Sequence, residues 1–239
     1  MITIIGNGKM ALAIAKGLKE NIEIVGRDEK KLKKFSEITG SKYYLLNNFD
    51  ITNKTIILAT KPYALESLNL KGKAKEVISI MAGKKIDEIK KYIEAEFYSR
   101  AMPNIGAEFM ASTTAIFGSD KTIEIFSKIG KAIKVNSEKE LDIATAIAGS
   151  GPAFLALVAE AISDGGVLCG LNRELSYELT AGLFKSFSAI EKRKPSEIKD
   201  SVMSPAGTTA SGYEKLEEGS VRNSFIKAIK SAYEKSQKI

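Results

Sequence analysis

The sequence of 239 residues contains no histidine and a single cysteine, Cys169. Without histidine the chain has no imidazole acid or base and no histidine-based metal site, and we expect no bound metal. A transferred proton must therefore come from another side chain or from water. One cysteine cannot form an internal disulfide. Its apolar neighbours within residues 166–170 predict a buried helical position rather than a reactive thiol.

Long apolar runs are also scarce. The chain begins with the short apolar segment Met1–Ile5 and lacks the basic segment and long apolar stretch of a signal peptide. No window approaches the about 18 to 20 apolar residues that cross a bilayer. We therefore expect a cytoplasmic protein with no membrane partner.

The charge balance is basic, with 36 lysines and arginines against 29 aspartates and glutamates and a net charge of +7. Such an excess can indicate a polyanionic partner such as nucleic acid. Here the lysines are scattered over predicted helix faces, as at residues 30–34, rather than gathered with aromatic residues on one stripe. We therefore expect no nucleic-acid partner.

The first part of the chain alternates short apolar runs with amphipathic ones, which is the pattern of a parallel sheet covered by helices. The predicted strands are Ile2–Ile5, Ile22–Val25, Lys42–Leu45, Thr55–Leu58, Glu76–Ile80, Phe97–Ala101, Thr113–Phe117 and Ala132–Val135.

The pattern changes after Asn136. Ser137 followed by Glu140 is a capping-box sequence, and from there onward the helical period continues without a convincing strand. We therefore predict an α/β domain over residues 1–137 and an all-α domain over residues 138–239. The predicted helices are Lys139–Ala148, Pro152–Cys169, Arg173–Glu191, Ser196–Ser201, Thr209–Leu216 and Arg222–Ser236.

The predicted helix Pro152–Cys169 is apolar on almost all sides. It must be buried on most faces, and a domain of about 100 residues offers limited cover. Either a second copy of the chain supplies that cover in an intertwined dimer, or the helices of its own domain suffice. The sequence leaves both alternatives open.

The segment Gly6-Asn7-Gly8-Lys9-Met10-Ala11 follows the first predicted strand and opens a helix. It has the G-x-G-x-x-A form of the dinucleotide fingerprint. Gly6 permits the tight turn, Gly8 lets a pyrophosphate approach the backbone, and Ala11 allows close helix packing. The helix N-terminus then faces the phosphates. The sequence therefore predicts a Rossmann-type domain.

The end of the second predicted strand bears on which dinucleotide binds. A site for NAD(H) places Asp or Glu about 20 residues beyond the first glycine, where it accepts a hydrogen bond from the ribose. Here the stretch reads Gly26-Arg27-Asp28, and Arg27 offers a guanidinium to a 2′-phosphate. NADP(H) is therefore favoured, with NAD(H) as the alternative.

Small or polar turns follow three further predicted strands. They are Ala59-Thr60-Lys61-Pro62, Met81-Ala82-Gly83 and Met102-Pro103-Asn104. Because ligands bind at the carboxyl ends of strands in open α/β sheets, we expect these turns beside the cofactor. Three ordinary loops are the alternative.

Two loops stand out in the helical half. Gly149–Pro152 has a structural explanation, with Ser150 or Gly151 as the N-cap and Pro152 near the first helical position. The loop Ser204–Thr209 is richer in hydroxyl groups than a cap requires, and free N–H groups at a helix start suit a carboxylate. The second loop is therefore the better candidate for a substrate site.

Six segments, in this order and spacing, resemble the pyrroline-5-carboxylate reductase family from residue 4 to about residue 235. They are GNGKMALA, LATKP, ISIMAG, RAMPN, AGSGPAF and SPAGTT. The resemblance implies a Rossmann domain joined to a helical dimerisation domain. It also implies hydride transfer from NAD(P)H to the imine carbon of a cyclic imino acid, 1-pyrroline-5-carboxylate, with proline as product.

The resemblance assigns residues to three roles. In the family the substrate loop meets the cofactor across a dimer interface, which implies a homodimer or a higher homo-oligomer. Thr209 matches a threonine that hydrogen-bonds the ring nitrogen. The implied substrate-carboxylate loop contains Ser204, Gly207, Thr208 and Thr209, and the implied cofactor contacts are Gly6, Asn7, Gly8, Lys9, Met10, Arg27, Ala59, Thr60, Lys61, Pro62, Ala82, Gly83 and Asn104.

The chain departs from the family pattern at three places. Ala206 stands where a second glycine is usual, which bears on loop geometry because alanine adopts a positive φ less readily than glycine. Phe154 replaces a common tyrosine, and Ile105-Gly106 replaces a common Thr-Pro pair. The last two look like packing or peripheral changes.

We expect the protein to hold the hydride donor and acceptor carbons about 3 to 3.5 Å apart. The ring nitrogen would be either protonated or hydrogen-bonded by Thr209, which makes the imine carbon electrophilic. A threonine cannot be a strong acid, so Thr209 would orient the ring while water supplies protons. A β-hydroxyacid dehydrogenase shares this layout but expects a lysine on the long interdomain helix, which here carries Glu160 and Asp164 instead. A non-catalytic NADP(H)-binding regulator is the remaining alternative, and the intact SPAGTT loop argues against it.

Overall fold

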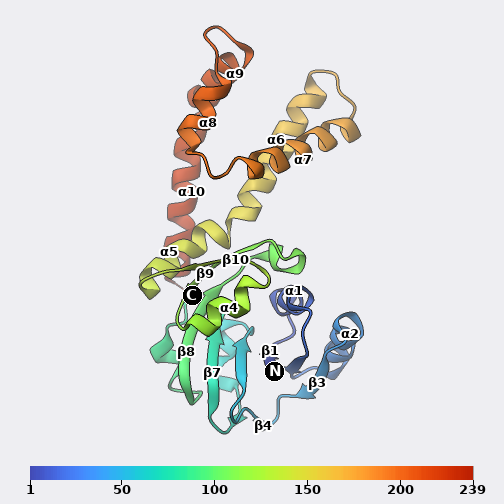
Figure 1. Cartoon of the computed structure of the whole chain (residues 1–239), viewed down its shortest axis with the longest axis vertical. Helices are drawn as coiled ribbons and strands as arrows, with labels where there is room; N and C mark the ends of the chain where they lie inside the picture. The colour runs from blue at the N-terminus through green and yellow to red at the C-terminus, as the bar shows by residue number, and fades with distance from the viewer. Residues whose placement is uncertain (239) are drawn as a thin grey trace. The chain divides into compact units, whose positions relative to one another are not determined.

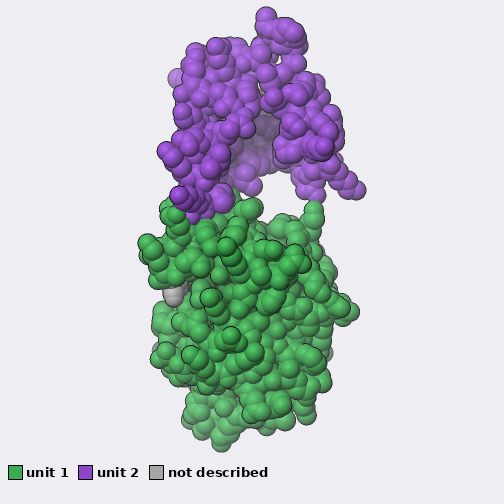
Figure 2. All heavy atoms as spheres, turned by 90° about the vertical axis from the view of Figure 1, so that its left-hand side faces the viewer, with its two compact units in different colours: residues 1–152, 231–239 green, residues 153–230 purple. Residues whose placement is uncertain are grey.

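The computed structural model describes residues 1–238. The chain forms two compact units, coloured separately in Figure 2. Unit 1 contains Met1–Pro152 together with the C-terminal residues from Ser231 onward, and unit 2 contains Ala153–Lys230.

Unit 1 is built on an eight-stranded sheet with the order β10-β9-β8-β7-β5-β1-β2-β3 (Figure 1). All predicted strands are present, and the three strands Ile2–Ile5, Ile22–Gly26 and Thr55–Leu58 are buried along their whole length. The strands are β1 (Ile2–Ile5), β2 (Ile22–Gly26), β3 (Lys42–Leu45), β5 (Thr55–Leu58), β7 (Ala74–Ser79), β8 (Ala95–Met102), β9 (Ser112–Phe117) and β10 (Gly130–Lys134).

The sheet is parallel except at one place. β8 and β9 pair antiparallel, with Ala101 opposite Ile116, whereas the sequence pattern predicted a parallel sheet. The connection between them is short and holds only the 3₁₀ helix η2 (Ile105–Phe109). A parallel crossover needs about a dozen residues or more, so this connection can join only antiparallel strands.

A second, two-stranded sheet consists of β4 (Phe49–Asp50) and β6 (Leu70–Lys71), and it was not predicted from the sequence. Strands of two residues are too short to show a period in the sequence.

Helices cover both faces of the large sheet. On one face Ile4 and Ile24 pack with residues of α1 (Lys9–Leu18) and α4 (Asp120–Ser127). On the other face Ile5 packs with residues of η1 (Pro62–Ser67) and with Ile89 of α3 (Ile86–Ile89). Each fully buried isoleucine contributes about 1.5 to 3 kcal/mol. This unit also contains α2 (Glu29–Thr39) and α5 (Glu138–Ala148).

Helix α5 begins after the predicted N-cap Ser137, but the capping box is incomplete because the Glu140 carboxylate bonds the amide of Asn136 and not that of Ser137. The Ser137 hydroxyl accepts a hydrogen bond from the Glu140 amide, and the Glu140 carboxylate accepts one from the Asn136 amide. Leu141 is buried with Met102 and Ala115, so α5 belongs to the compact unit of the sheet. The division into domains of residues 1–137 and 138–239 stays a prediction.

The remaining helices match the predicted ones to within about two residues at each end. Inside unit 2, Ser176 of α7 donates a hydrogen bond of 2.8 Å to the Ser163 carbonyl of α6. A Cβ on Gly166 would lie 2.3 Å from the Ser176 hydroxyl, so these two helices approach closely. The helices are α6 (Gly151–Leu168), α7 (Arg173–Ala189), α8 (Pro195–Val202), α9 (Thr208–Glu218) and α10 (Val221–Ser236).

Two expectations about the apolar helix are wrong. By length and composition the helical stretch Glu138–Leu168 could cross a membrane, although it is interrupted near Gly149. The sequence pattern predicted no such segment because this stretch has no unbroken apolar run. Its mean hydropathy is nevertheless high, since the glycine and serine residues within it lower the mean only a little. Cys169 is exposed because it follows the end of α6, in a turn rather than inside the helix.

The apolar surface of α6 and α7 is largely uncovered in the single chain. Leu157 of α6 is 63% exposed and Leu183 of α7 is 52% exposed. The helices of unit 2 therefore do not supply the cover that the composition of α6 demands. The sequence left two alternatives for burying α6, a second copy of the chain or the other helices of the same domain. The exposure of Leu157 and Leu183 rules out the second alternative.

Candidate functional site

The turn between β1 and α1 has the backbone of a dinucleotide site. Gly6 has φ of +118°, and a Cβ there would lie 2.5 Å from the Ala59 carbonyl oxygen, so only glycine fits. A Cβ on Gly8 would meet open space. Gly8 is the N-cap of α1 and provides no side-chain cap, and the first turn contains no acidic residue. The first N–H groups of α1 are therefore available to an anion.

Asn7 lies inside this turn. Its Nδ2 atom is buried and has no hydrogen-bond partner among residues 1–238. An unsatisfied buried donor costs about 1 to 3 kcal/mol, which an acceptor on a bound ligand would offset. Together with the free N–H groups of α1, this orphaned donor fits a bound dinucleotide.

Arg27 follows the last residue of β2 directly. It is exposed and forms no ion pair within the described chain. The neighbouring Asp28 caps α2, because its Oδ1 accepts a hydrogen bond of 3.1 Å from the Lys31 amide. That hydrogen bond holds the pKa of Asp28 below its usual value. The carboxylate of Asp28 is therefore engaged as the cap of α2, whereas the guanidinium of Arg27 has no partner within the described chain.

The three predicted turns lie where their strands end. Thr60 and Lys61 follow β5, Ala82 and Gly83 follow β7, and Asn104 follows β8. Because β1, β2, β5, β7 and β8 are parallel, the carboxyl ends of these strands share one edge of the sheet with Gly6 and Arg27. The fold therefore brings all the predicted cofactor segments to one edge.

Asn104 has a different use from the others. Its Oδ1 accepts a hydrogen bond of 2.9 Å from the Gly106 amide, and its Nδ2 donates one of 3.1 Å to the Ala148 carbonyl. The side chain thus caps η2 and fastens the end of α5. These two hydrogen bonds hold the loop in place. A direct contact from the Asn104 side chain to a cofactor remains a prediction.

The loop Ser204–Thr209 lies in unit 2 and joins α8 to α9. The Ser204 carbonyl accepts a hydrogen bond of 3.0 Å from the Gly207 amide, which closes a turn, and Ala206 within it has φ of +57°. Gly207 is the N-cap of α9 and provides no side-chain cap. Within the described chain, the hydroxyls of Ser204, Thr208 and Thr209 have no hydrogen-bond partner. The loop therefore presents hydroxyl and N–H donors together, as a carboxylate requires.

A polar cluster that joins α8, α9 and α10 was not predicted from the sequence. Arg222 at the start of α10 donates a hydrogen bond of 2.6 Å to the Tyr213 hydroxyl and pairs with Glu217. The hydrogen bond from Arg222 holds the pKa of Glu217 below its usual value. Lys199 of α8 lies 5.9 Å from the centre of the Tyr213 ring. One signal was available, because a cation in the first turn of a helix opposes the helix dipole and so implies a specific partner.

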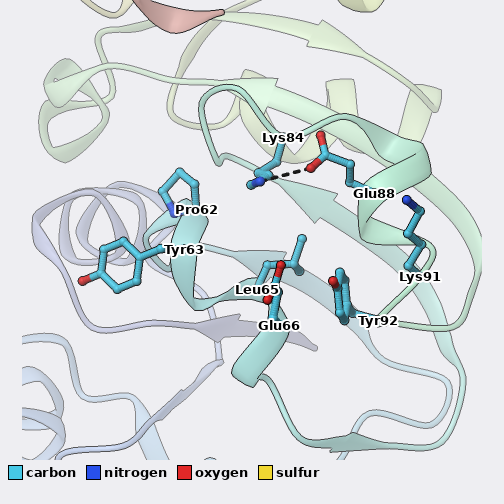
Figure 3. Close-up of a pocket in the computed structure, with 8 residues that line it drawn as sticks. All are labelled: Pro62, Tyr63, Leu65, Glu66, Lys84, Glu88, Lys91 and Tyr92. Carbon is cyan, nitrogen blue, oxygen red and sulfur yellow. Dashed lines mark hydrogen bonds and ion pairs between the residues drawn. The ribbon is translucent and has the colours of Figure 1, made fainter. Parts of the chain in front are cut away.

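A hollow of about 210 Å³ lies near η1 and α3 (Figure 3). Lys84 and Glu88 form an ion pair of 3.0 Å at its wall. Of the predicted site residues only Pro62 lines it. The lining residues are Pro62, Tyr63, Leu65, Glu66, Lys84, Glu88, Lys91 and Tyr92. The hollow is thus separate from the turn that fits the dinucleotide.

Comparison with protein families divides the chain into two matching regions. Residues 138–239 match the model described as pyrroline-5-carboxylate reductase dimerisation. Residues 1–83 match the model described as NADP oxidoreductase coenzyme F420-dependent.

Comparison with whole proteins extends over nearly the full chain. The chain is 34% identical to a pyrroline-5-carboxylate reductase of Helicobacter pylori strain J99, over 98% of each protein. It is 36% identical to that of Synechocystis sp. strain PCC 6803, over 99% of this chain and 97% of the relative.

Two solved structures share the fold. One is the 1-pyrroline-5-carboxylate reductase of Streptococcus pyogenes, with a TM-score of 0.87 and 27% identity over 100% of this chain and 98% of the other. The second is the Plasmodium falciparum pyrroline carboxylate reductase with NADP bound. It has a TM-score of 0.81 and 27% identity, over 99% of this chain and 96% of that chain.

Proposed function

Because the chain belongs to the pyrroline-5-carboxylate reductase family, we propose that it reduces 1-pyrroline-5-carboxylate to L-proline, the final step of proline biosynthesis, with NADPH as electron donor. The observation that carries this proposal is the Ser204–Thr209 loop. Its unpartnered hydroxyls lie beside the uncapped start of α9, which suits the carboxylate of a small imino acid.

The cofactor is held by unit 1. Gly6 and Gly8 would let the pyrophosphate approach the first N–H groups of α1, and Asn7, Lys9 and Met10 would help to hold it. The guanidinium of Arg27 binds the 2′-phosphate, which distinguishes NADPH from NADH. Thr60–Pro62 and Ala82–Gly83 border the same edge. Bound NADPH supplies the hydride that reduces the imine carbon.

The substrate is held by the loop of unit 2. The amides at the start of α9 and the hydroxyls of Ser204 and Thr208 donate hydrogen bonds to the carboxylate. Thr209 donates a hydrogen bond to the ring nitrogen and so polarises the C=N bond. When the carbon gains a hydride, the nitrogen gains a proton from water. The contribution of Thr209 is orientation, because a threonine hydroxyl is too weak an acid to transfer its own proton.

A second copy of the chain is the partner. The family model matched by residues 138–239 is a dimerisation model, which agrees with a homo-oligomer. A homodimer supplies cover for the exposed apolar faces of α6 and α7, and we place the enzyme in the cytoplasm. The apolar composition of α6 does not require that it span a membrane, because a second copy of the chain would bury its apolar side chains.

The test is oxidation of NADPH in the presence of 1-pyrroline-5-carboxylate, run beside NADH and beside a six-membered cyclic imine. We expect turnover with the five-membered imine and a lower KM for NADPH than for NADH. Arg27→Ala should raise the KM for NADPH more than the KM for NADH, whereas Lys34→Ala, an exposed lysine farther along α2, should change neither. Absence of turnover with every pair, together with tight cofactor binding, would support the non-catalytic regulator instead.

A further inference from the structure

Tyr63 is an aromatic residue without a partner at the edge of the predicted cofactor site. It is the second residue of η1, directly after Pro62, and it is 81% exposed. The next two residues of this short helix, Ala64 and Leu65, are buried. Within the described chain the Tyr63 side chain has no hydrogen bond, ion pair or ring contact.

Figure 3 shows how the ring is directed. Tyr63 lies at the rim of the hollow, and its ring extends away from the Lys84–Glu88 pair and from Tyr92. An exposed ring leaves much of its apolar surface in water, which is unfavourable. Neither packing of η1 nor the hollow accounts for the position of this ring.

The order of the strands places the segment after β2, which begins with Arg27, and the segment after β5, which leads to Tyr63, on opposite sides of β1 and its glycine turn. β1 lies between β2 and β5, with Ile5 opposite both Val25 and Leu58. Neighbouring strands are about 4.8 Å apart, so the ends of β2 and β5 are separated by about 9.6 Å. Arg27 follows β2, and the segment leading to Tyr63 follows β5. A planar ring between two stacked groups needs about 7 Å, because each contact requires about 3.5 Å.

We propose that Tyr63 forms one wall of the adenine subsite, with the adenine ring of the cofactor between the Tyr63 ring and the guanidinium of Arg27. This inference rests on the proposed function, since adenine is part of the dinucleotide. A guanidinium can stack through its flat face while its N–H groups bind a phosphate. Arg27 therefore serves both the adenine and the 2′-phosphate, whereas Tyr63 serves the adenine alone.

The two roles predict different patterns of affinity. NADPH and NADH carry the same adenine and differ by the 2′-phosphate. Loss of the Tyr63 ring should weaken both cofactors by the same factor. Loss of Arg27 should weaken NADPH more than NADH. The tyrosine hydroxyl has no part in stacking, so Tyr63→Phe should bind both cofactors as the wild type does.

The experiment is isothermal titration calorimetry of the full-length protein with NADPH and with NADH. Alanine at a stacking position weakens binding by about 5- to 150-fold, so we expect Tyr63→Ala to raise both Kd values within that range. Tyr92→Ala is the matched control, because Tyr92 is a neighbouring exposed aromatic on the hollow, and it should leave both Kd values unchanged. Tyr63→Gln replaces the ring by an exposed polar chain and should reproduce the alanine result.

The outcomes separate this inference from the proposed function. If Tyr63→Ala and Tyr63→Gln bound NADPH as tightly as the wild type, the adenine wall would be overturned and the reductase function would be unaffected. Failure of the wild type to bind NADPH would overturn both. Weakening of NADPH alone in Tyr63→Ala would also overturn the inference, because it would assign Tyr63 to the 2′-phosphate.

Discussion

Ala206 is a residue whose side chain and backbone conformation are mismatched. It has φ of +57° in the turn that closes between Ser204 and Gly207. A left-handed conformation costs an L-residue about 1 to 2 kcal/mol, and glycine avoids that cost. We expect Ala206→Gly to raise the free energy of unfolding by up to about 1 kcal/mol, partly offset by the greater freedom of glycine in the unfolded chain.

Thermal unfolding checks this prediction. The control is Ala228→Gly in the middle of α10, where glycine should instead lower the free energy of unfolding by about 1 kcal/mol. If both glycine variants lowered the Tm alike, the turn would be unstrained. A change of KM for the imino acid in Ala206→Gly would connect the strain to substrate binding.

Thr209 tests the difference between orientation and acid catalysis. A single neutral hydrogen bond contributes about 0.5 to 1.5 kcal/mol, so Thr209→Ala should lower kcat by about ten-fold at most. Thr209→Ser retains the hydroxyl and should stay close to the wild type. Steady-state kinetics decide the matter, because a fall of about 100-fold or more would identify Thr209 as a proton donor.

At the scale of elements, a buried guanidinium joins β8 to α5. The Arg100 side chain is inaccessible, with contacts of 2.9 Å to Asp142 and 3.1 Å to Glu138. Gln237, near the C-terminus, also donates a hydrogen bond to Asp142. Removing one partner of a buried ion pair leaves an unpaired charge, at a cost of about 3 to 5 kcal/mol.

We therefore expect Arg100→Met to lower the free energy of unfolding in urea by about 3 to 5 kcal/mol. The double variant Arg100→Met with Asp142→Leu removes the more buried of the two carboxylates left without a partner and should recover part of that loss. A single variant within about 1 kcal/mol of the wild type would mean that α5 is held by its apolar contacts alone.

A second buried carboxylate connects three central segments of the sheet. Glu23 of β2 accepts hydrogen bonds of 2.7 Å from Lys54 and 2.9 Å from Thr3 of β1. Burial alone would raise the pKa of Glu23, but these hydrogen bonds and the charge of Lys54 hold that pKa below its usual value of 4.5. A lowered pKa stabilises the fold above pH 4.5, and this stability is lost as the pH falls through the folded-state pKa.

Glu23→Gln should therefore lower the free energy of unfolding at neutral pH by about 1 to 3 kcal/mol. It should also reduce the loss of stability on acidification below pH 4.5. The control is Glu37→Gln on the exposed side of α2, which should leave both quantities unchanged. Denaturant titrations at a series of pH values measure the effect, and an unchanged acid dependence in Glu23→Gln would contradict it.

At the scale of the whole molecule, the exposed apolar helices predict self-association. Burial of Leu157 and Leu183 against a second copy would contribute about 1.5 to 3 kcal/mol for each side chain. A carboxylate at either position would be desolvated, so Leu157→Glu and Leu183→Glu should dissociate the oligomer. Ile38→Glu is the matched control, because Ile38 is 56% exposed on α2 in the other unit. Analytical ultracentrifugation distinguishes the variants, and a monomeric wild type would refute the prediction.

Local pattern was enough to predict the elements of this protein. The strands of the large sheet and the helices after residue 137 were found within a few residues, because periodicity, caps and glycine turns act over neighbouring residues. The family resemblance came from short motifs of the same local kind. The antiparallel β8–β9 pair, the two-residue strands and the exposure of Cys169 were missed, because pairing partners and burial depend on distant parts of the chain.

What the sequence by itself determined was therefore the type of each element and the identity of the candidate site residues. The tertiary structure decided which of their polar groups are occupied. Asn104 bonds to Ala148, 44 residues later, and Asp28 caps its own helix, whereas Asn7 and Arg27 remain unpaired within the described chain. The reason is that a hydrogen bond depends on distance and direction in space, which a pattern of residue types does not contain.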